Sequence, residues 1–212
     1  MKKIVSIVLA VSMLAVCVTG CKTTTRKQLK PVVLNEVAHS IFYAPQYAAI
    51  ELGYFEDEGL DLTLVNGAGA DKVMTALISG DADIGFMGSE ASIYVYQQGS
   101  DDYAVNFAQL TQRAGNFLVG REAQDNFTWA DLKGKKVLGG RAGGMPEMVF
   151  EYILKKNGID PAADLTIDQS INFGLTAAAF TSNDADYTVE FEPFATGLEK
   201  EGNGHVIASL GV

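Results

Sequence analysis

The sequence predicts an α/β protein of two similar lobes, each with a mainly parallel sheet, and a ligand cleft between them. After about residue 31, strand and helix patterns alternate, as parallel sheets require. The same order of elements occurs twice, and its landmarks Pro45 and Pro146 are 101 residues apart. The tripeptide Asp-Ala-Asp also occurs twice, at 81–83 and 184–186, an offset of 103 residues. Matching order and offset over roughly ninety residues argue for a duplicated fold.

The first lobe is best defined by residues 35–65, which complete a βαβ unit begun by a strand at Pro31–Glu36. Pro45 suits the first turn of a helix, where its missing N–H would have no partner. Gly53 suits the left-handed position that ends such a helix, and Leu60–Leu64 alternate like a half-buried strand. The helix between them should bury one face made of Pro45, Ala48, Ala49 and Leu52.

Both lobes then continue with the same series of elements. For the first lobe we expect a helix at 70–78, a strand at 84–87, a helix from Ser89 to about Gln98 and a strand at 104–110. For the second we expect a capped turn at 128–131, strands at 135–139, 165–167, 187–190 and 205–208, and helices at 143–157, 174–181 and 193–201. The first of these helices should bury Met145, Val149, Tyr152 and Ile153.

The link between the lobes is expected within Gln112–Gly120. It divides the chain into a first lobe at 31–115, expected to be incomplete, and a second lobe at 116–212.

The N-terminus has the pattern of an export signal. Lys2 and Lys3 precede an apolar run at 4–18 that is short for a membrane span. The run ends in Val18-Thr19-Gly20-Cys21, which resembles the bacterial lipobox and implies cleavage before Cys21 and lipidation of that cysteine. Cys17 fits less well because bulky Val16 precedes it. The alternative is that Cys21 is an incidental small residue after a signal peptide.

We therefore expect residues 1–20 to be a signal peptide and 21–30 a lipidated, flexible tether that holds the domain on the outer face of the cell membrane. The mature chain would keep no second cysteine, so neither a disulfide nor a cysteine-based metal site is expected.

Composition and charge exclude several classes of protein. The 212 residues are 48% hydrophobic and 20% charged, which is ordinary for a globular protein. The net charge of -10, with no basic stripe, argues against a nucleic-acid partner. His39 and His205 are too isolated to suggest a metal site, and no cofactor is expected.

Several phrases occur in the same order as in a known family. They are Tyr43-Ala44-Pro45, Glu51-Leu52-Gly53-Tyr54-Phe55, Glu58-Gly59-Leu60-Asp61, residues 76–85 (ALISGDADIG), residues 131–137 (DLKGKKV) and Glu192-Pro193-Phe194-Ala195. Together they resemble bacterial ABC-importer substrate-binding proteins, and more narrowly the group that carries sulfonates, nitrate, taurine and thiamine-pyrimidine precursors. The resemblance implies a monomeric two-lobed binding protein of the type II periplasmic fold, which closes on a small-molecule solute and delivers it to a permease and its ATPase.

Family members are usually much longer than this chain of 212 residues. The resemblance therefore implies a chain truncated at its C-terminus, with an incomplete first lobe and exposed apolar surface.

Glycine-rich helix starts supply one group of candidate ligand-binding residues. The first turn of a helix presents unpaired N–H groups and the positive end of its dipole, which can hold anionic or carbonyl groups. Three such starts should converge at the cleft, although glycines at helix starts also occur for packing alone. The candidates are Gly67, Ser89, Glu90, Gly143, Gly144 and Met145.

Side chains beyond strand ends supply a second group. His39, Phe42 and Tyr43 follow the first strand and could clamp a flat solute, or pack locally instead. Thr111-Gln112-Arg113 offer hydrogen bonds. Arg141 is the one cation predicted at a strand end of the second lobe; it suits a sulfonate or carboxylate, unless it is a surface residue.

Three carboxylates, Glu90, Glu190 and Glu192, are predicted to face the cleft. There they would repel an anion and accept hydrogen bonds from amino or ring N–H groups, although each could be a solvated helix-start residue. This balance favours a neutral or weakly basic heteroaromatic solute, such as a pyrimidine, over a sulfonate or nitrate.

Two other functions stay open. Fungal pyrimidine-precursor synthases resemble the same fold, with His39 in the region of their first loop, but the export signal and the lack of a paired nucleophile and base argue against an enzyme. A surface receptor that senses a solute and signals through a partner is the other alternative.

Overall fold

A computed structural model of the protein describes residues 28–172 and 174–211. The predictions made for the signal peptide, for Cys21 and for most of the tether lie outside these residues. Among the helices that the structure describes, none is both long and apolar enough to cross a membrane.

Strands and helices alternate along the chain, as the α/β prediction requires. The strands are β1 (Lys30–Glu36), β2 (Leu60–Asn66), β3 (Ile84–Phe86), β4 (Asn116–Gly120), β5 (Lys136–Leu138), β6 (Thr166–Asp168), β7 (Tyr187–Phe191) and β8 (His205–Ser209). The α-helices are α2 (Ala44–Glu51), α3 (Tyr54–Asp57), α4 (Ala70–Ser79), α5 (Glu90–Gln97), α6 (Met145–Lys156), α7 (Thr176–Ser182) and α8 (Phe194–Lys200), with 3₁₀ turns at Ile41–Tyr43 and Trp129–Leu132.

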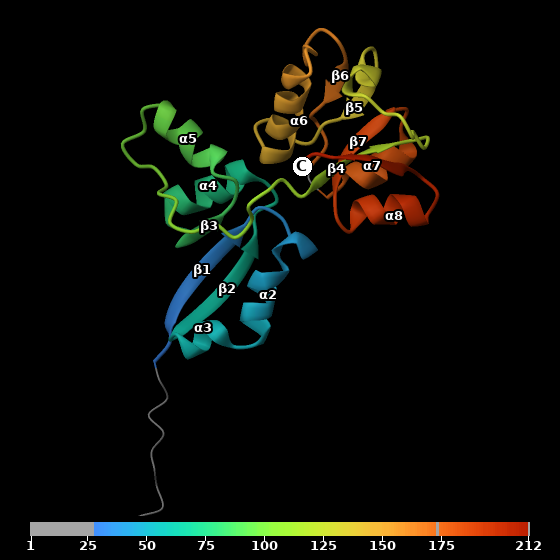
Figure 1. Cartoon of the computed structure of the whole chain (residues 1–212). Coiled ribbons are helices and arrows are strands. Elements are labelled where there is room, and N and C mark those ends of the chain that lie inside the picture. Colours follow the sequence, from blue (N-terminus) through green and yellow to red (C-terminus); the bar gives the residue numbers. More distant parts are fainter. Residues whose placement is uncertain (1–27, 173, 212) are drawn as a thin grey trace, which may run out of the picture.

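The strands form two sheets. A three-stranded sheet has the order β2-β1-β3 with both pairs parallel, and a five-stranded sheet has the order β6-β5-β7-β4-β8. In the second sheet β5 is parallel to β6 and β7, while β4 runs antiparallel between β7 and β8. The order β6-β5-β7 repeats β2-β1-β3, so the tandem order of elements is present in space. Figure 1 shows the three-stranded sheet in the lower part of the view and the five-stranded sheet at the upper right, with α6 on the side of the five-stranded sheet that faces α5.

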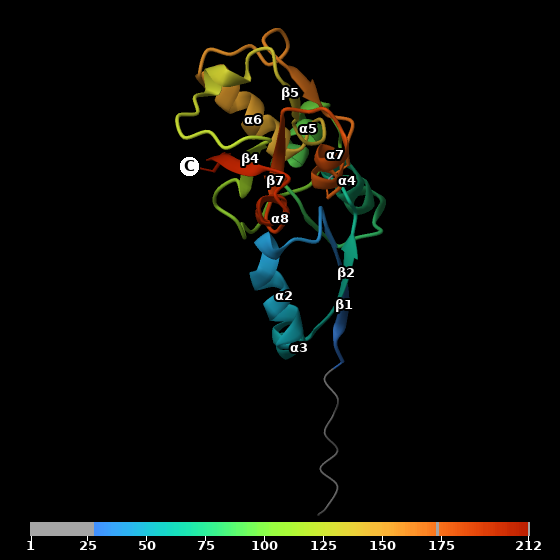
Figure 2. The same cartoon turned by 90° about the vertical axis from the view of Figure 1, so that its right-hand side faces the viewer.

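Local signals explain several element boundaries. Pro45 lies in the first turn of α2, and Gly53, with a φ of 75°, follows its last turn. Thr128 and Asp131 form the predicted capping box of the Trp129–Leu132 turn. Figure 2 shows α2 and α3 lying beside β1 and β2.

The two Asp-Ala-Asp turns make the same contacts in both sheets. The second aspartate of each turn accepts a hydrogen bond from a backbone N–H of the neighbouring strand, β1 or β5: Val33 N to Asp83 Oδ2 is 2.8 Å, and Lys136 N to Asp186 Oδ2 is 2.9 Å. Each aspartate also donates its own N–H to the carbonyl of that same strand residue. Because the alanine between the two aspartates is buried in both turns, the tripeptide fixes where β3 and β7 begin beside β1 and β5.

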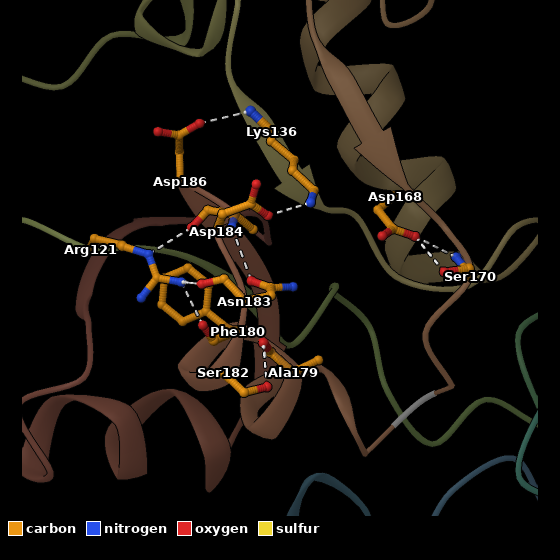
Figure 3. A network of polar contacts seen from close by, with 11 residues as sticks. Arg121, Lys136, Asp168, Ser170, Ala179, Phe180, Ser182, Asn183, Asp184 and Asp186 are labelled. Carbon is orange, nitrogen blue, oxygen red and sulfur yellow. Dashed lines mark hydrogen bonds and ion pairs between the residues drawn. The ribbon is translucent and has the colours of Figure 1, made fainter.

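The second turn carries an additional network (Figure 3). The Arg121 guanidinium donates to the carbonyls of Phe180, Asn183 and Ala185 at 2.6 to 2.8 Å and lies over the Phe180 ring. It therefore satisfies the carbonyls that the end of α7 and the turn leave open.

Two predictions about strands are wrong. Residues 104–110 form no strand; within the described chain no strand pairs with them, and the Phe107 side chain is 78% exposed. The link expected at Gln112–Gly120 instead contains β4, which enters the five-stranded sheet. An alternating pattern becomes a strand only where a neighbouring strand supplies hydrogen bonds, and such a neighbour cannot be seen locally in sequence.

One predicted helix face is wrong, and another is correct only in part. In α2 the buried side chain is Gln46, whereas Pro45, Ala48 and Leu52 are exposed. In α6 Val149 and Ile153 pack against the core as predicted, but Tyr152 is exposed, and the fully buried apolar residues are Phe150 and Leu154. Phe150 and Leu154 are buried because they face the core of the five-stranded sheet, where they pack with Leu118, Val137 and Ile159.

Replacement of the second aspartate of the turn should destabilise the fold. We expect Asp186→Ala to lower the free energy of unfolding by about 1–3 kcal/mol, because the part-buried Lys136 N–H loses its partner. Urea unfolding measures the change. Asp184→Ala is the matched control: its side chain is 83% exposed, and it contacts only the Lys136 ammonium, so a much smaller effect is expected. Equal effects of the two substitutions would contradict the role given to Asp186.

Candidate functional site

A cavity of about 870 Å³ lies between elements of the two sheets. Its lining comes from the carboxyl ends of β1, β3 and β7, the first turns of α4, α5 and α6, and the extended segment 102–116. Carboxyl ends of strands and N-termini of helices are the usual ligand-binding features of α/β folds. The cavity is therefore the candidate site.

Ten of the fourteen predicted ligand-binding residues line this cavity. They are Phe42, Tyr43, Ser89, Glu90, Thr111, Gln112, Arg141, Gly143, Gly144 and Met145. The other four, His39, Gly67, Glu190 and Glu192, lie outside its lining.

His39 and Gly67 belong to the scaffold next to β1. The His39 ring stacks on Tyr47, and its Nδ1 lies 2.9 Å from Oε1 of the buried Glu36. Glu36 also accepts hydrogen bonds from Gln46 and from the Tyr47 hydroxyl. A Cβ at Gly67 would lie 2.6 Å from Asn35 Oδ1 and 2.8 Å from Val73, so this glycine permits close packing of the chain.

The two glutamates outside the cavity bind helices of the second lobe: Glu190 connects β7 to α7, and Glu192 contacts the first turn of α8. Glu190 is buried and accepts hydrogen bonds from the Thr188 and Thr176 hydroxyls at 2.7 and 3.0 Å. Burial raises the pKa of Glu190 to about 7, although the two hydroxyls act in the opposite direction. Glu192 accepts from the N–H and hydroxyl of Thr196 in the first turn of α8.

Aromatic rings from both sheets form one wall of the cavity. Phe42 lies 5.8 Å from Phe191 and 5.6 Å from Tyr43, and Tyr43 meets Phe86 edge-on at 4.6 Å, all between ring centroids. A Cβ at Gly115 would lie 2.4 Å from the Phe42 ring, so only glycine lets the ring reach this position. Burial raises the pKa of Tyr43 to about 12, which keeps its phenol neutral. The wall offers flat apolar surface to a planar solute.

The Glu90 carboxylate lies at the N-termini of two helices. It folds back over Gly88 at the start of α5, and the side chain is 4% exposed. Desolvation raises the pKa of Glu90, while the backbone N–H groups of Glu90 and of Met145, the first residue of α6, lower it. These helix starts, which the sequence suggested for an anionic ligand group, therefore already have a carboxylate from the protein.

Arg141 links the two sides of the cavity mouth. Its Nη2 lies 2.6 Å from Asp71 Oδ2 in the first turn of α4, with side-chain exposures of 32% for Arg141 and 58% for Asp71. Tyr94 donates to Met148 Sδ at 2.9 Å, and Ser40 donates to the Glu192 carbonyl at 3.3 Å. The Arg141 guanidinium was predicted to suit an anionic ligand, but it already pairs with the Asp71 carboxylate.

Four of the lining residues that the sequence analysis did not predict bear on the chemistry of the cavity. Phe86 and Phe191 are the last residues of β3 and β7. Phe42 and Tyr43 were chosen because residues after the carboxyl ends of strands often line a ligand site, and the same reasoning applies to Phe86 and Phe191. Asp71 lies in the first turn of α4. Asn116 was hidden because the strand that it begins was taken for a link. Among the described residues no group of three or more His, Cys, Asp or Glu side chains is placed to hold a metal ion.

Comparison with known proteins places this fold in a family. The family model described as NMT1/THI5 like matches residues 41–207. "Putative binding protein YtlA" of Bacillus subtilis (strain 168) is 50% identical over 192 residues, which are 91% of this chain and 57% of that protein.

Solved structures agree in fold. A protein from Bordetella bronchiseptica RB50 gives a TM-score of 0.67 at 25% identity, covering 85% of this chain and 57% of that one. The periplasmic aliphatic sulphonate binding protein SsuA from Escherichia coli gives 0.64 at 17% identity, covering 84% and 60%. The chain thus spans less than two thirds of each of these relatives.

The predicted resemblance is confirmed, and the relatives identified by function are binding proteins, not enzymes. Because the family model matches most of the sequence, from the 3₁₀ turn before α2 to β8, the chain belongs to the NMT1/THI5-like family.

Proposed function

We propose that this protein is the extracytoplasmic solute-binding component of an ABC importer, which captures a small organic solute and passes it to a permease and its ATPase. The observation that carries the proposal is the cavity of about 870 Å³ bounded by strand ends and helix starts from both sheets. Its volume lies in the range of small-molecule sites. The family and the names of the relatives support binding as the activity.

The preferred solute is a nitrogen heteroaromatic molecule of the pyrimidine type, and a sulfonate-like or nitrate-like anion is second. The aromatic wall of Phe42, Tyr43, Phe86 and Phe191 suits a flat ring. Two further contacts act against an anion: Glu90 occupies the helix starts, and Asp71 holds Arg141. An incoming anion would have to displace Asp71 and would face the Glu90 carboxylate.

The ten predicted residues that line the cavity are proposed as ligand contacts, and 31–115 and 116–212 as the lobes that close on the ligand. His39, on which the enzymatic alternative depended, lies outside the lining. A receptor would use the same cavity, but nothing among the described contacts favours it over an importer component.

The proposed localisation is the outer face of the cell membrane, through a lipid on Cys21. We expect Cys21→Ala to move the protein from the membrane fraction to the soluble fraction, because the acylated thiol is lost. Cys17→Ala is the matched control and should stay in the membrane fraction. Membrane retention of Cys21→Ala in a fractionation blot would contradict the anchor.

Ligand capture without turnover is the first test of the proposed function. We expect the purified protein to release a small molecule on denaturation, identified by mass spectrometry, and to be stabilised against heat by that compound, since binding to the native state alone raises stability. Recovery of chemically altered ligand after incubation would contradict a binding protein. Binding of no compound from a panel of pyrimidines, sulfonates and nitrate would contradict the proposal itself.

The ion pair across the cavity mouth should slow ligand release. We expect Asp71→Asn and Arg141→Gln each to raise the ligand dissociation rate several-fold with little change in association rate, because the pair joins the first turn of α4 to the residues before α6 across the cavity. Stopped-flow fluorescence measures both rates.

The same pair is half-exposed, so its loss should change stability by less than about 1 kcal/mol. Lys155→Gln is the control, since it breaks an ion pair with Glu151 inside α6. An equal rise of the dissociation rate in Lys155→Gln would contradict the role of the pair. An unchanged dissociation rate in both Asp71→Asn and Arg141→Gln would also contradict it.

A further inference from the structure

Glu147 is a buried carboxyl group directly behind the mouth of the cavity. It lies in the first turn of α6, is 6% exposed and does not line the cavity itself. Its Oε2 accepts the Gly143 backbone N–H at 3.1 Å, and its Oε1 accepts the Gln169 side-chain amide at 3.0 Å. One carboxyl group therefore joins α6 to the loop before it and to the segment after β6.

The loop before α6, residues 140–144, is the part of the second lobe that reaches across the mouth; we call it the mouth loop. It lines the cavity, and its Arg141 pairs with Asp71 of the first lobe. Gly140 and Gly143 have φ angles of 86° and 74°, which glycine adopts at no steric cost. Because glycine also leaves many other conformations open, the hydrogen bond from Gly143 to Glu147 restricts a loop that would otherwise be poorly fixed.

The first lobe holds a loop of the cavity in a similar way. Gln46 and Glu147 each follow the proline in the first turn of their helix, and both are buried. Gln46 donates to the buried carboxylate of Glu36. The Tyr47 hydroxyl also donates to Glu36 and accepts the Ser40 N–H in the loop after β1. In each lobe a buried carboxyl group bonded to an amide thus stands behind a loop that lines the cavity.

The surroundings of Glu147 make its charge sensitive to pH. Burial raises the pKa of Glu147 to about 7, and its hydrogen bond with the Glu151 carboxyl group acts in the same direction, whereas the Gly143 N–H lowers the pKa. Lys155 opposes the rise weakly, since it is paired with Glu151 at 2.8 Å. The ionised carboxylate is the stronger acceptor for the Gly143 N–H, because charge-assisted hydrogen bonds are stronger than neutral ones.

The other charged groups on the neighbouring elements are engaged elsewhere. On the mouth loop, the Arg141 guanidinium lies 2.6 Å from Asp71. At the end of β6, the Asp168 carboxylate accepts from the N–H and hydroxyl of Ser170. Glu151 is therefore the charge that acts most directly on Glu147.

We propose that Glu147 is a positioning residue of the cavity, which holds the mouth loop through Gly143 so that Arg141 reaches Asp71, and which loosens the loop when it is protonated. This role rests on the proposed function, because it concerns how the mouth of the same cavity is kept in place. The loop is held most firmly above about pH 7, and the hold weakens as the pH falls through that value.

The direct test is an NMR titration of the whole protein without any solute, from about pH 5.5 to pH 8.5. We expect the Gly143 amide proton to move downfield as the pH rises, with a midpoint near pH 7, because its acceptor becomes charged. A Gly143 amide that does not titrate in this range overturns the inference.

Two conservative variants identify the titrating group. Glu147→Gln should abolish the titration of the Gly143 amide, since its amide oxygen accepts the same hydrogen bond at every pH. Glu151→Gln is the matched control: it should keep the titration but lower the midpoint, because the neighbouring negative charge is removed. A titration that persists in Glu147→Gln, or an unchanged midpoint in Glu151→Gln, overturns the assignment.

Hydrogen exchange separates a positioning role from a purely structural one. We expect Glu147→Ala at pH 8 to speed amide exchange in the mouth loop about five- to tenfold, the effect of losing one hydrogen bond, and to leave β5 and the later turns of α6 unchanged. Faster exchange throughout β5 and α6, or none in the loop, would overturn the proposal.

Failure of this inference and failure of the proposed function are distinguishable, because neither experiment needs a solute. If no solute binds but the mouth loop titrates as expected, only the proposed function fails. If a solute binds but the Gly143 amide does not titrate, only the role of Glu147 fails.

Discussion

The fold and the site both depend on one contact that occurs twice, the pairing of the second aspartate of each Asp-Ala-Asp turn with the neighbouring strand, β1 or β5. Asp83 donates its backbone N–H to the Val33 carbonyl and accepts the Val33 N–H at its carboxylate, and Asp186 does the same with Lys136. These contacts set where β3 and β7 start. Because both strands are short, their start also fixes where they end, and the residues at those ends, Phe86 and Phe191, stand in the cavity wall.

The second constraint is electrostatic. The first turns of α4, α5 and α6 all reach the cavity, and three helix dipoles pointing at one place would ordinarily favour an anion. Here Glu90 meets the N–H groups of α5 and α6, and Asp71 in the first turn of α4 holds Arg141. The carboxylates of Glu90 and Asp71 therefore already occupy these positive groups, and this is why a flat neutral solute is proposed over an anion.

The sequence was informative where the signal is local or repeated. Pro45, Gly53 and the Thr128 capping box marked element boundaries because capping and left-handed glycine act within a few residues. The repeated tripeptide revealed the tandem order because each copy must meet the same strand neighbour. Features that depend on contacts between residues distant in sequence could not be predicted in this way. Whether 104–110 or 116–120 becomes a strand depends on which sheet edge is within reach, and the buried face of α6 depends on the core that it meets.

The same division applies to the site. Most of the residues predicted next to glycine-rich helix starts and after β1 line the cavity, since those positions follow from topology, but Gly67 and His39 do not. Glu190 and Glu192 also lie at a strand end, but Thr176, Thr188 and Thr196 satisfy them, and only tertiary packing reveals those partners. Asn116 was not predicted because the strand that it begins depends on its neighbours β7 and β8, which are distant in sequence.

The proposed function requires that a small solute bind in the cavity between the two sheets. The most direct measurement is a crystal structure of the protein with the solute that it releases on denaturation. We predict that this solute lies against the Phe42–Phe191 wall, beside the first turns of α5 and α6. A solute bound elsewhere on the protein would contradict the proposed site.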